Sequence, residues 1–286
     1  MPDRPDEAAR RAYWTEQMDL AAELMVSICR YPVAECGEAM VALPEAAAAE
    51  GVEVIFPRTE LVPDHRRLFY LRGGLVEPFL AAAADMNRKG WVLRLEDGFR
   101  TRSMQKGLVR KQGVFDTILK RLLWERRGQL PEADFVARRV AVLVAESPRH
   151  GTHMAGSAID ISVVRAADGK EVQRGGPYLE FSELTPMGSP FVTAQARRNR
   201  AEITALMARH AFMAYPYEFW HYCQGDVIAE FVSGSGRPAR YGPVDWDPAT
   251  GEIRPIDRPE LPLNSMAEIR MEIERAMARL GDAHPT

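Results

Sequence analysis

Segments with helical and strand-like periodicity follow one another irregularly along this chain, and this order most constrains its fold. Helices are expected at 6–28, 74–88, 101–126, 132–145, 194–210 and 265–280. Strands are expected at 91–99, 156–164, 170–174 and within 212–222, with the Asp168-Gly169 turn making a hairpin of the second and third. The regular strand–helix repeat of a doubly wound parallel sheet is not seen. The order predicts an α+β fold in which helices flank an antiparallel sheet.

A shift in composition near residue 235 divides the 286-residue chain. We expect residues 1–235 to form a single domain, with an N-terminal helical extension over about 1–60. Residues 236–286 are rich in proline and glycine and end in a helix, where Ser265 and Glu268 fit a capping box. We expect this segment to wrap over the domain. The N- and C-terminal helices are candidates for a lid over a cleft or for a contact in a homo-oligomer.

Charge and apolar patterning exclude several functional classes. The net charge is −3, and the short basic clusters are interleaved with acids, so no stripe for nucleic acid is expected. The sequence has no run of about 18 apolar residues for a membrane span, and its charged start lacks the apolar part of a secretory signal. Three cysteines without a Cys-x-x-Cys pair fit a reducing compartment. We therefore expect a cytoplasmic protein that binds neither nucleic acid nor membrane.

Two short segments carry residue types that a catalytic metal requires. The first contains His153 and Asp160, and the second contains Glu218 and His221. Catalytic zinc sites use three protein ligands and leave one position for water. His153, Asp160 and His221 would supply two neutral nitrogens and a carboxylate. The metal would then keep a charge near +1 and lower the pKa of its water to roughly 7.

Glu218 stands three residues before a candidate ligand and could act as a general base. It would take a proton from the attacking water and pass it to the leaving amine. A Glu-x-x-His pair alone is weak evidence, because many helices contain it by chance. On a regular strand, moreover, side chains three positions apart point to opposite faces. Glu218 and His221 can therefore converge only if the chain bends between them.

A third segment, Asp97-Gly98-Phe99-Arg100, follows the strand expected at 91–99. An arginine at this place could stabilise the oxyanion that forms when water attacks a carbonyl. The alternative for Arg100 is a surface salt bridge with Glu96 or Asp97. The small residues at 156–158, Ser157 among them, would let a substrate or metal approach the backbone closely.

The order of these motifs resembles the zinc D-alanyl-D-alanine dipeptidases of the vancomycin-resistance type, which have the D,D-peptidase and Hedgehog-like fold. The resemblance covers about residues 65–225 and rests on four ordered pieces, which are the 97–100 turn, the 153–160 spacing, the 218–221 spacing and the 186–191 loop. It implies one zinc ion per chain, bound by His153, Asp160 and His221. It also implies that Glu218 is the base and that Arg100 steadies the transition state.

The resemblance also ranks the remaining candidates. Thr152, Ser157 and Val192 are expected to contact the substrate. His150 is a competing ligand, but it stands ten rather than seven positions before Asp160 and is therefore ranked as supporting or structural. Val192 occupies a position where the family usually has an acid that holds the substrate's ammonium group. Glu180 or Glu183, from a segment longer than the family's, could restore that contact.

Three functions from two classes follow from these residues. The leading one is zinc-dependent hydrolysis of a small peptide, with D-Ala-D-Ala as the default substrate. The second is a D,D- or L,D-carboxypeptidase acting on cell-wall peptides, against which the missing signal sequence argues. The third is an inactive, zinc-stabilised binding module, which would need neither Glu218 nor Arg100.

Overall fold

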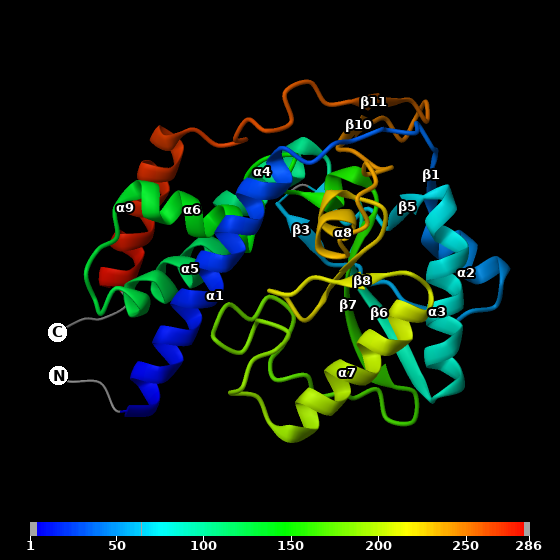
Figure 1. The fold of residues 1–286 in the computed structure, drawn as a ribbon, viewed down its shortest axis with the longest axis horizontal. Helices are drawn as coiled ribbons and strands as arrows, with labels where there is room; N and C mark the ends of the chain where they lie inside the picture. Colours follow the sequence, from blue (N-terminus) through cyan, green and yellow to red (C-terminus); the bar gives the residue numbers. More distant parts are fainter. Residues whose placement is uncertain (1–4, 64, 283–286) are drawn as a thin grey trace.

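A five-stranded sheet lies at the centre of the computed structural model, which describes residues 5–63 and 65–282 (Figure 1). Its strand order is β2-β6-β7-β9-β8. All neighbours are antiparallel except β2 and β6. The strands are β2 (Val54–Ile55), β6 (Trp91–Asp97), β7 (Ala158–Arg165), β8 (Met213–Ala214) and β9 (His221–Cys223). Strands and helices are thus combined in an α+β fold, as the order of the sequence patterns predicts.

The register of the central strands brings three polar side chains together. Strand β6 pairs with β7 in regular register from Trp91 to Leu95, then shifts so that Asp97 faces Asp160. On the other side of β7, Asp160 faces His221 of β9. Directly opposed residues of antiparallel strands share a face of the sheet. Pairing alone therefore places Asp97, Asp160 and His221 in a row across three strands.

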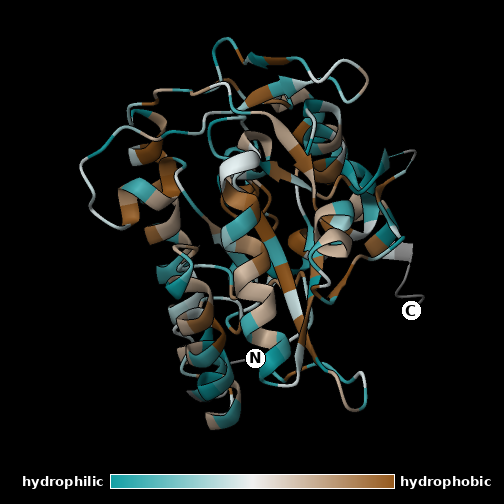
Figure 2. Ribbon diagram, turned by 90° about the vertical axis from the view of Figure 1, so that its right-hand side faces the viewer, coloured by the Kyte–Doolittle hydropathy of each residue, from teal (hydrophilic) through white to brown (hydrophobic). Residues whose placement is uncertain are grey.

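The opposite face of this sheet is apolar and is covered by two helices. These are α3 (Val76–Arg88) and α7 (Ala194–Arg209). Strand residues of odd number, such as Leu95, Ile159 and Ile161, are fully buried in a core with Phe79 and Met207. Figure 2 looks from the side of α3 and shows the brown, apolar stretches of the strands. Because strand side chains alternate, Asp160 points away from this core.

A group of helices lies on the other side of the sheet, at the left in Figure 1. It consists of α1 (Pro5–Cys29), α5 (Gln112–Glu125), α6 (Ala133–Leu143) and α9 (Met266–Asp282), and α4 (Arg102–Arg110) leads into it from the sheet. Its apolar core includes Trp14, Phe115 and Val140. The buried Glu125 carboxylate accepts a hydrogen bond from the Trp14 indole at 2.9 Å and also pairs with Arg139. The helices at the two ends of the chain therefore pack into the same group.

The chain between α8 (Val227–Val232) and α9 crosses the top of the molecule in Figure 1. It contains the hairpin of β10 (Val244–Trp246) and β11 (Ile253–Pro255). Within it, Trp246 packs against Phe99 with ring centroids 5.5 Å apart, and Asp245 pairs with Arg102. The segment thus contacts residues on both sides of Arg100.

The remaining elements are short. They are β1 (Met40–Ala42), α2 (Leu43–Ala49), β3 (Glu60–Val62), β4 (His65–Arg66), β5 (Tyr70–Arg72), η1 (Gly73–Leu75) and η2 (Thr152–Ala155). Strand β1 pairs with β5, and β3 with β4, as separate two-stranded sheets. Within the described part of the chain, no helix has the length and apolar character needed to cross a bilayer.

Three expected elements differ in detail from those found. The helix expected over 101–126 is two helices, because Lys111 is extended (φ −62°, ψ 117°) and its ammonium group donates to the Leu61 carbonyl at 2.7 Å. The strand expected at 170–174 is reduced to a single bridge between Val164 and Glu171. The apolar run 212–222 forms two short strands joined by a turn, and this turn carries Glu218.

Candidate metal centre

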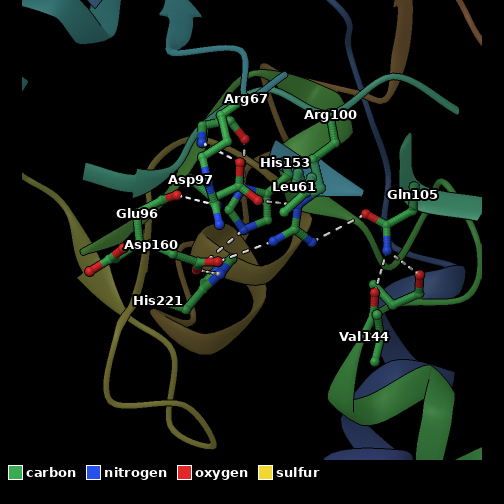
Figure 3. A network of polar contacts seen from close by, with 12 residues as sticks. Leu61, Arg67, Glu96, Asp97, Arg100, Gln105, Val144, His153, Asp160 and His221 are labelled. Carbon is green, nitrogen blue, oxygen red and sulfur yellow. Dashed lines mark hydrogen bonds and ion pairs between the residues drawn. The ribbon is translucent and has the colours of Figure 1, made fainter. Parts of the chain in front are cut away.

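Three buried side chains from separate elements converge on one point (Figure 3). His153 comes from η2, Asp160 from β7 and His221 from the start of β9, and their relative exposures are 4%, 2% and 6%. The Asp160 Oδ1 atom lies 3.3 Å from His153 Nε2 and 3.0 Å from His221 Nδ1. Tetrahedral zinc with bonds of about 2.0–2.1 Å places neighbouring donor atoms about 3.3 Å apart. The observed spacing therefore fits a metal ion.

A glycine turn delivers His153 to this point. Gly156 ends η2 in the left-handed conformation, with φ of 69°. A Cβ atom there would lie 2.5 Å from the Met40 methyl group, so strain and crowding both favour glycine. The turn reverses the chain between His153 and β7 and lets His153 and Asp160 approach each other.

Hydrogen bonds select the ring nitrogens that face the centre. His153 Nδ1 lies 2.7 Å from the Gly98 carbonyl, which can only accept, so Nδ1 carries the proton and Nε2 keeps its lone pair. His221 Nε2 lies 3.1 Å from the Thr152 hydroxyl, and its Nδ1 faces Asp160. Ligand histidines are commonly oriented by such partners on the second nitrogen. Both rings thus turn one nitrogen toward Asp160 Oδ1.

Arg100 fixes the carboxylate of Asp160 from the other side. One terminal guanidinium nitrogen donates to Asp160 Oδ2 at 3.1 Å, and Tyr178 Oη donates to the same oxygen at 3.0 Å. Arg100 Nε donates to Asp97 Oδ2 at 2.7 Å, and its other terminal nitrogen lies 3.3 Å from Gln105 Oε1. These contacts reserve Asp160 Oδ1 for the metal. The Asp97 ion pair is one of the two salt bridges considered for Arg100, and it is buried rather than at the surface.

Burial and neighbouring charges shift the pKa values of all three candidate ligands. Burial and the nearby Arg100 guanidinium lower the pKa of His153, so its ring is neutral. Burial would raise the pKa of Asp160, but His153 and His221 hold it well below its ordinary value. Burial opposes protonation of His221 too, yet its hydrogen bond with Asp160 raises its pKa. A metal ion at His221 Nδ1 would compete with the proton that this hydrogen bond favours.

Glu218 lies in the turn between β8 and β9 rather than on a strand. The Tyr215 N–H donates to the His221 carbonyl at 2.9 Å and the His221 N–H donates to the Glu218 carbonyl at 3.3 Å, which closes the turn. This is the bend that the Glu-x-x-His spacing requires. Glu218 is half-buried and lines the same cavity as His153, Asp160 and His221.

Burial raises the pKa of Glu218 to about 8, and His221 and Arg100 partly oppose the shift while Asp160 adds to it. A cation bound beside the carboxylate would lower this pKa toward neutrality. A group that titrates near neutral pH is well suited to accept and return a proton.

The cavity beside the cluster has two kinds of wall. Its polar wall contains Arg100, Thr152 and Glu218 together with the three candidate ligands. Its apolar wall comes from five helices (α1, α4, α5, α6 and α8) and from loops, and includes Met25, Leu108, Val114, Val142, Leu143, Val144, Phe181, Trp220 and Ile228. Among the described residues that line it, Asp160 and Glu218 are the carboxylates. The helical group thus closes one side of the metal centre.

The three residues expected to contact substrate lie in different places. Thr152 lines the cavity, but its hydroxyl is engaged by His221. Ser157 is fully buried and donates to Asp226 Oδ2 at 2.7 Å. Val192 is buried beside Gly175, outside the cavity lining. These positions argue against substrate contacts for Ser157 and Val192. Ser157 is hydrogen-bonded to Asp226, which caps α8, and Val192 packs beside Gly175.

The structure also gives definite positions to His150, Glu180 and Glu183. His150 lines the cavity, yet its Nε2 lies 2.9 Å from Cys29 Sγ, and it is not part of the three-residue cluster. Glu183 is buried in ion pairs with Arg10 and Arg121. Neither Glu180 nor Glu183 is among the described residues that line the cavity.

A cluster of two histidines and an aspartate with a carboxylate on the same cavity is the arrangement of hydrolytic metalloenzymes. The family model described as D-ala-D-ala dipeptidase (peptidase M15) matches residues 59–232, and the chain belongs to this peptidase family. The match includes the 97–100 turn and all three candidate ligands.

Comparisons with two individual proteins give more limited matches. The D-alanyl-D-alanine dipeptidase of Enterococcus faecium is 29% identical over 75 residues, a match of 26% of this chain and 37% of that protein. The aligned part therefore spans little more than a third of the relative's length. The solved structure of the LdcB LD-carboxypeptidase aligns over 74% of this chain and 78% of its own, with 16% identity and a TM-score of 0.35.

Several residues of the centre carry no clear signal in the sequence. Tyr178 comes from the long coil after β7, and Gln105 from the first turns of α4. Their local sequence does not indicate a contact with the centre, and only the fold brings them there. Asp97 is visible as part of the Asp-Gly-Phe-Arg turn, although its role as the partner of Arg100 needs the bulge in β6.

Proposed function

We propose that this chain is a zinc-dependent peptidase that hydrolyses a small peptide, with D-Ala-D-Ala as the default substrate. The observation that carries the proposal is the convergence of His153, Asp160 and His221 on a cavity that Glu218 and Arg100 also line. Membership of the D-ala-D-ala dipeptidase family supports the reaction class.

The donor set suits one zinc ion. Two imidazole nitrogens and one carboxylate oxygen, each held by a second partner, are the ligands of many catalytic zinc sites. When bound, zinc would acidify a water molecule and polarise the carbonyl of the scissile peptide bond. Three protein ligands would leave a coordination position for water or substrate, which a purely structural site would close.

Glu218 is the residue that moves the proton. Its carboxylate accepts a proton from the attacking water and then donates it to the amine that leaves, so the carboxylate is regenerated. The carbonyl carbon gains the oxygen of water, and the carbon–nitrogen bond breaks as the amine takes the proton. A pKa that a bound cation lowers from about 8 toward neutrality suits both steps, because the carboxylate can then accept the first proton and release it again.

Arg100 has two tasks in this scheme. It holds Asp160 through Oδ2, and guanidinium N–H groups beyond those bonded to Asp97, Gln105 and Asp160 remain for the substrate. A cation that lies beside the ligands would stabilise negative charge on the carbonyl oxygen during attack. Loss of Arg100 would therefore disturb both the ligand geometry and the transition state.

The carboxylates of the cavity bear on the choice of substrate. Asp160 and Glu218 both have roles at the metal, and the opposite wall is apolar. A free ammonium group placed against that wall would lose hydration without gaining a partner. This favours a second candidate, a carboxypeptidase that takes acylated or longer peptides, beside the dipeptidase. An inactive binding module is less favoured, since it would need neither Glu218 nor Arg100.

The test is hydrolysis by zinc-loaded protein of D,D-, L,D- and L,L-dipeptides, followed by D-Ala-D-Ala compared with its N-acetylated form. Cleavage of a D,D-peptide supports the proposal, and absence of cleavage in the whole set contradicts it. Comparable rates with free and acetylated amines indicate the carboxypeptidase. A preference above roughly a hundredfold for the free amine, or about 2.7 kcal/mol, indicates an ammonium-binding acid and the dipeptidase.

A further inference from the structure

Tyr215 carries a polar group on the cavity wall that the reaction scheme does not yet use. The residue follows β8, is 3% exposed and lines the cavity together with Glu218 and the three candidate ligands. Its hydroxyl oxygen is buried and has no hydrogen-bond partner in the part of the chain that the structure describes. A phenol is protonated at neutral pH and can donate one hydrogen bond.

The surroundings of Tyr215 hold its ring in place. Its backbone N–H donates to the His221 carbonyl at 2.9 Å. Its ring meets the His221 ring edge-on, with centroids 5.6 Å apart, and the Tyr217 ring at 5.5 Å. A phenol fixed in this way cannot easily swing away to find another acceptor. The ring that lines the cavity, with its unpartnered hydroxyl, is therefore already held in place in the free protein.

Other buried tyrosines of this fold have a partner for the hydroxyl. Tyr222 Oη lies 3.1 Å from Thr204 Oγ1, and Tyr241 Oη donates to Glu38 Oε2 at 2.7 Å. If the Tyr215 hydroxyl had a structural role, it would be expected to have such a partner, because buried polar groups are normally hydrogen-bonded. An unpaired donor beside a catalytic centre is instead suited to an acceptor that arrives with the ligand.

His150 Nδ1 is a second buried atom without a partner on the same wall of the described structure. It is a weaker candidate, since either ring nitrogen of His150 could carry the proton while Nε2 contacts Cys29. The donor character of Tyr215 does not depend on such a choice. Among the described residues, the apolar wall around both offers no competing acceptor side chain.

We propose that the Tyr215 hydroxyl donates a hydrogen bond to an oxygen of the bound peptide and is a substrate-contacting residue of this site. The acceptor is a carbonyl oxygen at the scissile bond or the terminal carboxylate, the two oxygen types that a peptide brings to the cavity. The proposal rests on the proposed function, because it assumes that the ligand is a peptide.

Tyr215→Phe tests this, because it removes one oxygen and keeps the ring contacts. We expect an unchanged zinc content and a thermal stability equal to or above that of the parent, since no protein hydrogen bond is lost. We expect kcat/KM to fall about 5- to 100-fold, according to whether the acceptor is neutral or charged. A fall of less than about fivefold, or a clear loss of stability in the zinc-loaded protein, overturns the proposal.

Two further variants separate this role from general effects. Tyr217→Phe removes the hydroxyl of the neighbouring half-buried tyrosine, which does not line the cavity, and should leave kcat/KM unchanged. Tyr222→Phe removes a hydroxyl that has a partner and should lower thermal stability. If Tyr215→Phe behaves like Tyr222→Phe, its hydroxyl is structural.

A second readout does not depend on turnover. A phosphinate analogue of D-Ala-D-Ala, with a free carboxylate or with that group amidated, should bind Tyr215→Phe at least about fivefold more weakly than the parent. A loss confined to the free acid identifies the carboxylate as acceptor, and an equal loss identifies the oxygens at the scissile position. Equal affinities of both proteins for both analogues overturn the proposal. Binding without hydrolysis by the parent would refute the proposed function and still test Tyr215.

Discussion

Replacement of Thr152 by valine separates metal binding from substrate binding. Valine keeps the shape of threonine and removes the oxygen that lies 3.1 Å from His221 Nε2. Thr152 and His221 are 3% and 6% exposed, so water has little access to replace the lost contact. When His221 binds a metal through Nδ1, its Nε2 must carry the proton and would then be buried without a partner.

The size of the effect follows from the cost of that unpaired group. A buried donor without an acceptor costs about 1–3 kcal/mol. The metal-free protein avoids the larger part of this cost, because His221 can place its proton on Nδ1, donate to Asp160 at 3.0 Å and leave only an unprotonated nitrogen at Nε2. The penalty therefore falls on the zinc-bound state, and we expect zinc to bind about 10- to 100-fold more weakly, as for other partners of ligand histidines.

The assay is competition for zinc with a chromophoric chelator at neutral pH. Thr204→Val is the matched control, since it removes a hydroxyl that contacts Tyr222 at the same distance, 3.1 Å, away from the metal centre. It should leave zinc affinity unchanged. If Thr152→Val binds zinc like the parent and shows only a higher KM, then Thr152 contacts the substrate, as the sequence alone suggests, and the argument from His221 is refuted.

Two further predictions concern buried charge. Arg100→Ala leaves Asp97 and Asp160 without their shared cation, so we expect a loss of about 3 kcal/mol in denaturant unfolding and at least a hundredfold lower turnover at saturating zinc. Unchanged values would leave Arg100 without either role. Burial raises the pKa of Glu146 from 4.5 to about 7. Ionisation of this carboxyl should therefore destabilise the fold by roughly 2–3 kcal/mol above pH 7. This penalty disappears as the pH falls toward 4.5. Glu146→Gln should therefore be more stable than the parent at pH 8 and equal to it near pH 4.5, and equal stability at pH 8 would show that Glu146 is well hydrated.

The sequence predicts the fold class and the main elements around the centre because periodicity reports which residues are buried. The alternation in 91–97 and 158–164 matches the two long central strands, and the helices at 76–88 and 194–209 lie close to their expected positions. The break at Lys111 escapes prediction because both flanking segments have helical periodicity. The contact of Lys111 with Leu61 is made between distant parts of the chain, which periodicity does not report.

The candidate site is predictable to the extent that it is encoded in short spacings. His153, Asp160, Glu218 and His221 stand in recognisable motifs, and the structure brings them to one cavity. The roles of Ser157 and Val192 cannot be inferred in this way, since the directions of their side chains depend on neighbours distant in sequence. Tyr215 stands three residues before Glu218 and gives no signal of its own, because an aromatic run usually belongs to the core.

The central claim is that Glu218 moves the proton at a zinc ion held by His153, Asp160 and His221. The most direct measurement is the turnover of D-Ala-D-Ala by the parent and by Glu218→Gln, with zinc content determined on the same samples. We predict about one zinc ion per chain in both proteins and at least a hundredfold lower kcat in the variant, because only the proton carrier is removed. Comparable turnover at equal zinc content would contradict the account.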